Sequence, residues 1–126
     1  MLLQLLEMSS KVTHNEQVLP FHGHWRQIGR LYGPFDAAFL PINGITQPKD
    51  IFPLSDQPLD MTPVQAVEAA RLLNAKLAIP IHYGRKPTTT YVEVPHPEQT
   101  FKEEAKERNQ PFEIVQPNNW ITWKAQ

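Results

Sequence analysis

Two short apolar runs that end in the same way are the feature that most constrains the fold of this chain. Residues 36–43 read DAAFLPIN before Gly44, and residues 76–82 read KLAIPIH before Tyr83 and Gly84. A short apolar run bounded by turn-forming residues is typical of a buried strand in a parallel sheet. Alternatively, the Pro-Ile step ends each strand at a sheet edge, because proline donates no hydrogen bond to the ladder. Both interpretations predict two strands.

Each predicted strand follows a predicted helix. In residues 25–32, the apolar side chains recur at helical spacing before the helix breaker Gly33-Pro34; they are Trp25, Ile28, Leu31 and Tyr32. The second helix, residues 63–73, begins with a threonine cap, a proline and a glutamine placed for a capping box. We expect its apolar face to be Val67, Ala70 and Leu73, with Glu68 and Arg71 facing water and Asn74 ending the helix.

This alternation of helix and strand predicts an α/β fold with a parallel pair of strands. The carboxyl ends of parallel strands meet at one edge, where open α/β sheets bind their ligands. Asn43 and His82 are therefore expected at the same rim. The loop over 43–61 is rich in proline and has no sustained periodicity, which fits either a lid over the site or a surface excursion.

The remaining segments carry weaker patterns. We expect an edge strand at 88–94, a helix at 96–109 with Phe101 and Ala105 toward the core, and terminal strands at 111–115 and 120–123. Trp120 and Trp123 are expected to pack. Residues 1–19 are expected to form a poorly defined segment, so that 20–126 is the folded part.

Composition excludes several classes of function. A length of 126 residues suits one domain, and a net charge of -1 provides no basic field for nucleic acid. There is no cysteine, so a metal would be bound by His, Asp or Glu. The apolar residues 1–6 are too few for a membrane span or a signal core, so we expect a cytoplasmic protein.

Histidines are the candidate metal ligands. His22-Gly23-His24 would place two imidazoles on one side of an extended segment, and together with His82 they form one candidate for a small metal-binding module. The sequence contains no Gly-x-Ser-x-Gly motif, phosphate-binding glycine loop or dinucleotide fingerprint. No catalytic nucleophile is therefore assigned.

Three motifs in order resemble the carboxyl-terminal half of metallo-β-lactamase-fold hydrolases. They are GRLYGPFDAAFLPI at 29–42, MTPVQAVEAA at 61–70 and IPIHYG at 79–84. The most similar branch contains ascorbate-6-phosphate lactonase-like proteins and the N-acylphosphatidylethanolamine phospholipase D type. The resemblance implies one half of a four-layer αββα sandwich, with 20–126 as that half. It also implies zinc- or manganese-dependent hydrolysis of an ester, a lactone or a phosphodiester.

By this resemblance His82 matches the last histidine ligand of the metal pair, while Asn43 and Tyr83 border the substrate cleft. The sequence contains no His-x-His-x-Asp-His cluster, and residues 17–21, QVLPF, lack the family's bridging aspartate. A single imidazole does not hold a catalytic zinc, so we expect a truncated relative that is inactive alone. Its missing ligands would come from a homodimer mate or a separate amino-terminal half. The alternative is a non-catalytic interaction protein that dimerises through an exposed sheet face.

Overall fold

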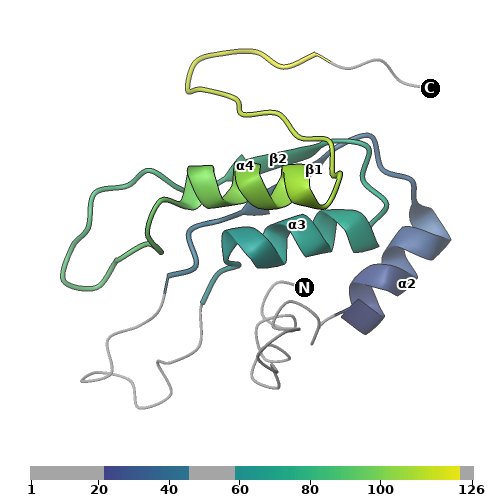
Figure 1. Cartoon of the computed structure of the whole chain (residues 1–126), viewed down its shortest axis with the longest axis horizontal. Helices are drawn as coiled ribbons and strands as arrows, with labels where there is room; N and C mark the ends of the chain where they lie inside the picture. Colours follow the sequence, from purple (N-terminus) through teal and green to yellow (C-terminus); the bar gives the residue numbers. More distant parts are fainter. Residues whose placement is uncertain (1–21, 46–58, 123–126) are drawn as a thin grey trace.

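A parallel pair of strands forms the centre of the fold. The computed structural model describes residues 22–45 and 59–122. Their elements are α2 (His22–Tyr32), β1 (Ala38–Pro41), α3 (Pro63–Leu72), β2 (Ala78–Ile81) and α4 (Pro97–Glu107), as Figure 1 shows. β1 pairs with β2 in parallel, with Ala38 opposite Ala78 and Pro41 opposite Ile81. The predicted α/β class and its parallel pair are confirmed.

The start of α3 is fixed by local hydrogen bonds. Thr62 Oγ1 accepts from the backbone N–H of Gln65 at 3.2 Å, and Gln65 Oε1 accepts from the backbone N–H of Thr62 at 3.0 Å. This capping box satisfies two amide groups that the helix itself leaves without partners, and Pro63 occupies a position where no N–H is needed. Asn74, just after the helix, has a left-handed backbone with φ 60°. Both ends of α3 therefore match the prediction.

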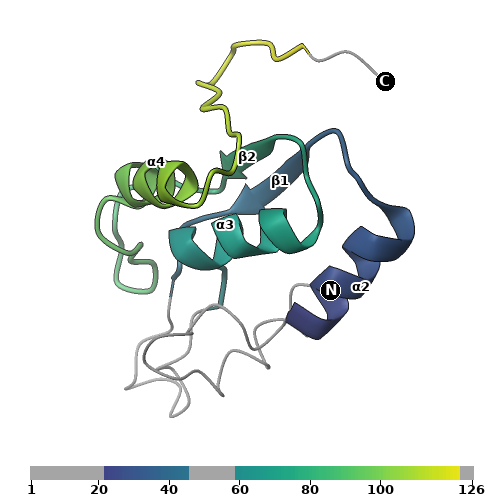
Figure 2. The same cartoon turned by 45° about the vertical axis from the view of Figure 1, so that its right-hand side comes forward.

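α3 is the helix around which the other elements pack. It contacts both strands, and α2 and α4 both lie against it (Figures 1 and 2). Three of its four fully buried residues are alanines, since Ala66, Ala69 and Ala70 are 0% exposed together with Val67. α2 approaches closely at Gly29, where an added Cβ would lie only 2.1 Å from the carbonyl oxygen of Leu72.

The core continues beneath α4. Phe101 and Ala105 are fully buried, as predicted. The ring of Phe101 meets Phe112 edge to face, with centroids 5.8 Å apart. The segment around Phe112 lies along β2, because the N–H of Ala78 donates to the carbonyl of Pro111 at 2.9 Å. One isolated parallel bridge, between Ala78 and Phe112, joins this segment to the sheet.

Several predicted elements are wrong. Residues 88–94 form a loop with a turn in which the N–H of Thr88 donates to the carbonyl of Tyr91, and they make no strand. Residues 111–115 contribute only the bridge at Phe112, and 120–122 are irregular. Trp120 does not pack, since it is 96% exposed. The predictions for residues 1–19, for Trp123 and for most of the loop over 43–61 fall outside the described residues.

Glu68 is a further correction. It was expected to face water, yet it is only 3% exposed. Its Oε2 lies 2.5 Å from Nη2 of Arg108, the C-cap residue of α4, and 3.0 Å from Nη1 of Arg71 on its own helix. The buried carboxylate is therefore paired, as buried charges are in folded proteins. Among the described residues, no helix is long and apolar enough to cross a membrane.

Candidate functional site

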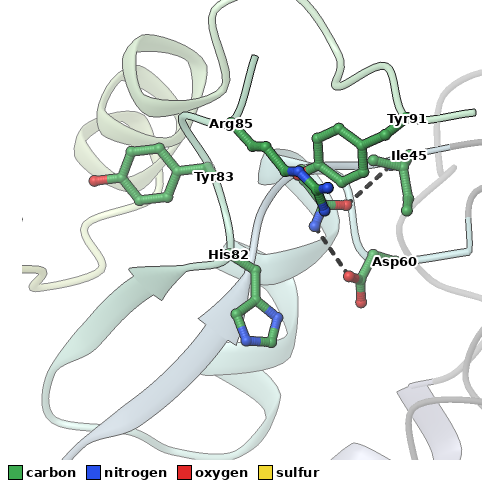
Figure 3. A pocket seen from close by; sticks show the side chains of 7 residues that line it. Ile45, Asp60, His82, Tyr83, Arg85 and Tyr91 are labelled. Atoms are coloured by element: carbon green, nitrogen blue, oxygen red, sulfur yellow. Dashed lines mark hydrogen bonds between the residues drawn. The ribbon is translucent and has the colours of Figure 1, made fainter. Parts of the chain in front are cut away.

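A cavity opens where β1 and β2 end. Its volume is about 350 Å³, and Figure 3 shows the side chains around it. The lining residues are Asn43, Ile45, Asp60, His82, Tyr83, Arg85 and Tyr91. Asn43 follows β1 and His82 follows β2, so the two strands deliver both side chains to one cavity, at the carboxyl edge of the sheet.

Asn43 organises one side of the cavity. It is 3% exposed. Its Nδ2 donates to Asp60 Oδ2 at 3.0 Å, and its Oδ1 accepts from the backbone N–H of Ile45 at 3.0 Å. Its carbonyl accepts from the N–H of Val94 at 2.8 Å. These bonds give Asn43 a positioning role toward Asp60 and the loop, while the predicted contact with substrate stays a prediction.

His82 has an unusual backbone at the end of β2. It is exposed, and its φ of 56° lies in the left-handed region. For a residue with a Cβ this conformation costs about 1–2 kcal/mol. Strained residues of this kind persist where the surrounding structure holds them, often at functional sites. The conformation therefore marks His82 as a candidate functional residue on grounds independent of its chemistry.

Tyr83 is turned toward α4. Figure 3 shows its ring directed away from Asp60 and Tyr91. Its hydroxyl donates to Glu98 Oε1 at 3.0 Å. Burial, together with the hydrogen bond and the negative charge of Glu98, raises the pKa of Tyr83 to about 12. At neutral pH the side chain is a phenol that ties the rim to α4, and its predicted substrate role remains a prediction.

The loop from Gly84 to Val94 forms the remaining wall. The carboxylate of Glu93 accepts from the backbone N–H of Gly84 at 2.6 Å and from that of Arg85 at 3.2 Å. The loop packs onto Gly44, where a Cβ would lie 2.6 Å from Cγ1 of Val94. The guanidinium carbon of Arg85 lies 4.9 Å from the ring centroid of Tyr91, a distance typical of a cation–π contact.

Two side chains of the kind that bind metals line this cavity. His82 and Asp60 are an imidazole and a carboxylate in one cavity, both suitable donors for zinc or manganese. Within residues 22–45 and 59–122, no three His, Cys, Asp or Glu side chains gather closely enough to hold an ion. A catalytic zinc takes about three protein ligands. This donor set therefore does not complete a metal site, and no reaction step is derived through one.

The predicted His22–His24 module loses its geometric basis. Both residues belong to α2, so the chain is helical there and not extended. The assumption of an extended segment was therefore wrong. In both Figure 1 and Figure 2, α2 lies at the opposite end of the molecule from the loop after β2.

Sequence reasoning did not single out Ile45 or three polar lining residues. Asp60 stands two positions before Thr62, the N-cap of α3. Because the capping box marks the start of α3, the sequence places Asp60 just before that helix. Arg85 follows the glycine that closes the second apolar run. Tyr91 lies in the β-branched stretch mistaken for a strand, and no local signal indicates that it lies against Arg85.

Comparisons with known proteins agree with this architecture. Residues 16–83 match the family model described as the beta-lactamase superfamily domain. A curated protein from Rubrobacter xylanophilus, named UPF0173 metal-dependent hydrolase, is 34% identical over 108 residues, which are 86% of this chain and 36% of that protein. The chain thus spans about a third of the length of the curated relative that it matches.

A solved structure has a similar fold. It is Igni18, described as a novel metallo hydrolase from the hyperthermophilic archaeon Ignicoccus hospitalis. The TM-score is 0.57 at 22% sequence identity, over 82% of this chain and 36% of that one. At this identity the likeness concerns the fold, and the mixed α/β arrangement is consistent with part of a metallo-β-lactamase fold.

Proposed function

We propose, for a chain that belongs to the beta-lactamase superfamily domain family, that it supplies the carboxyl-terminal rim of a metal-dependent hydrolase site. The observation that carries the proposal is the position of His82. Its imidazole stands on a strained backbone at the carboxyl end of β2 and shares a cavity with Asp60. The reaction class is hydrolysis of an ester, a lactone or a phosphodiester, in line with the lactonase-like and phospholipase D-like proteins that the motifs resemble.

In this proposal His82 is a ligand of zinc or manganese and Asp60 is the neighbouring carboxylate donor. A metal held there would supply Lewis-acid chemistry, which in metal-dependent hydrolases lowers the pKa of a bound water molecule. Asn43 holds Asp60 in place through its amide. The other ligands are supplied in trans, by a second polypeptide or a homodimer mate, so the 126-residue chain by itself binds metal weakly and lacks hydrolytic activity.

A zinc titration tests this assignment. We expect the ring resonances of His82 to shift on addition of zinc to the 126-residue chain. Replacement His82→Ala should weaken the affinity by about tenfold, because a neutral imidazole is the strongest zinc donor among the cavity residues. His24→Ala is the matched control, since His24 is exposed on α2, and it should leave the affinity unchanged. Equal affinity of the wild type and His82→Ala would contradict the proposal.

A second candidate is a non-catalytic interaction protein. Phe39 on β1 is 50% exposed although its strand neighbours Ala38 and Leu40 are buried. Its side chain lies on the face of the sheet opposite to theirs, because successive strand residues alternate. An exposed aromatic side chain on a sheet face favours association, so we retain homodimerisation through this face as the alternative.

A further inference from the structure

We propose that Arg85 is a binding site for an oxyanion, and that the substrate of the cavity carries a phosphate or carboxylate group beside the bond that is cleaved. The statement about the substrate rests on the proposed function, whereas the binding of the anion does not. The proposal is carried by the position of Arg85 in the cavity, by its aromatic support and by the engagement of the nearby carboxylates elsewhere.

Arg85 lines the same cavity as His82, and its guanidinium lies over Tyr91 (Figure 3). This cation–π contact supports the guanidinium, which carries five N–H donors. In the part of the chain that the structure describes, no carboxylate forms an ion pair with this guanidinium. Its donors therefore remain available to a ligand.

Two carboxylates are candidates for an ion pair with Arg85: Glu93, the acidic residue nearest to it in the sequence, and Asp60, which lines the same cavity. Both have other partners. Glu93 accepts from the backbone N–H groups of Gly84 and Arg85. These hydrogen bonds hold the loop through its backbone and do not involve the Arg85 side chain. Asp60 accepts from the amide of Asn43. An unpaired arginine held on a ring is suited to a planar, bidentate oxyanion such as a carboxylate or a phosphate. The negative charge of Asp60 in the same cavity should keep the affinity modest, with a Kd in the millimolar range.

A titration of the chelator-treated 126-residue chain tests the proposal without metal. Inorganic phosphate and, separately, acetate are added at constant ionic strength, and the Nε–Hε resonance of Arg85 is followed by NMR. We expect a saturable shift with at least one anion. Tighter binding of phosphate would point to phosphoester substrates, and tighter binding of acetate to carboxylate-bearing esters or lactones.

Variants test whether Arg85 is the residue that binds the anion. R85Q should weaken anion binding at least fivefold, and R85K should also weaken it, because lysine keeps the charge but not the two-pronged geometry. R30Q removes an exposed charge on α2 and should bind as the wild type does. Y91L should weaken binding several-fold, since Arg85 loses its support, whereas Y91F keeps the ring and should retain it.

Two results would overturn the proposal: no saturable shift with either anion, or R85Q binding as tightly as the wild type. His82→Ala should leave phosphate binding intact, because His82 takes no part in it. Failure of the zinc titration with retained phosphate binding would remove the proposed hydrolase function and leave the anion site standing. Normal zinc binding without anion binding would remove the anion site and leave the proposed hydrolase function standing.

Discussion

The hydrogen bond from Tyr83 to Glu98 sets how the rim responds to alkaline pH. The folded protein holds the pKa of Tyr83 at about 12, above its ordinary value of 10.0, so folding favours the neutral phenol. A raised pKa contributes stability that is fully present below pH 10 and is lost as the pH rises toward 12. We expect Tyr83→Phe to show a smaller loss of unfolding free energy over this interval than the wild type, measured by urea denaturation at several pH values.

Tyr32→Phe is the control for this experiment. Tyr32 is 73% exposed at the end of α2 and should leave the alkaline loss unchanged. An ultraviolet titration of tyrosinate gives a second measurement, in which the component that titrates near pH 12 should be absent from Tyr83→Phe. If that component persists in the variant, another group is responsible for it.

At the scale of elements, the ion pair between Glu68 and Arg108 joins α3 to α4. The Glu68 side chain is 4% exposed and that of Arg108 is 25% exposed. Breaking a buried pair by removing one partner costs about 3–5 kcal/mol, and the partial exposure of Arg108 places this case at or below the lower end. We expect Glu68→Ala to lower the free energy of unfolding by about 2–3 kcal/mol, measured by urea denaturation.

Glu107→Ala is the matched control, because Glu107 is an exposed acid on α4. Its effect should stay within about 0.5 kcal/mol, as for most surface substitutions. A loss of stability in Glu68→Ala no larger than in this control would mean that the ion pair contributes nothing to the packing of the two helices.

For the whole molecule, the half-exposed side chain of Phe39 on β1 raises the question of association. If the chain dimerises through the sheet face that bears Phe39, its mass in sedimentation equilibrium should rise with concentration in the micromolar range. Phe39→Glu should abolish the rise, because it places a charge in an apolar interface. Val92→Glu adds the same charge at another exposed apolar position and should not. A monomer at all concentrations would contradict homodimerisation.

The features that the sequence predicted correctly depend on local patterns. The features that it did not predict depend on contacts between residues distant in the sequence. The apolar runs ending at Asn43 and His82 and the capping box at Thr62 depend on neighbours within a few residues, so they are legible in the sequence. The burial of Glu68 depends on Arg108, the C-cap residue of another helix. The β-branched residues near Tyr91 form a loop because Glu93 binds the backbone after β2. The contact between Arg85 and Tyr91, which are two of the seven lining residues, depends on how this loop closes.

The alanine face of α3 has a consequence for how the cavity keeps its shape. Alanine has no side-chain rotamers, so Ala66, Ala69 and Ala70 cannot adjust to a change in the elements packed on α3. These three positions therefore offer no rotamer change that would widen or tilt the rim. Evolution or engineering toward a new substrate should therefore proceed through the loop from Gly84 to Val94, and larger residues on this face should be rejected before they alter specificity.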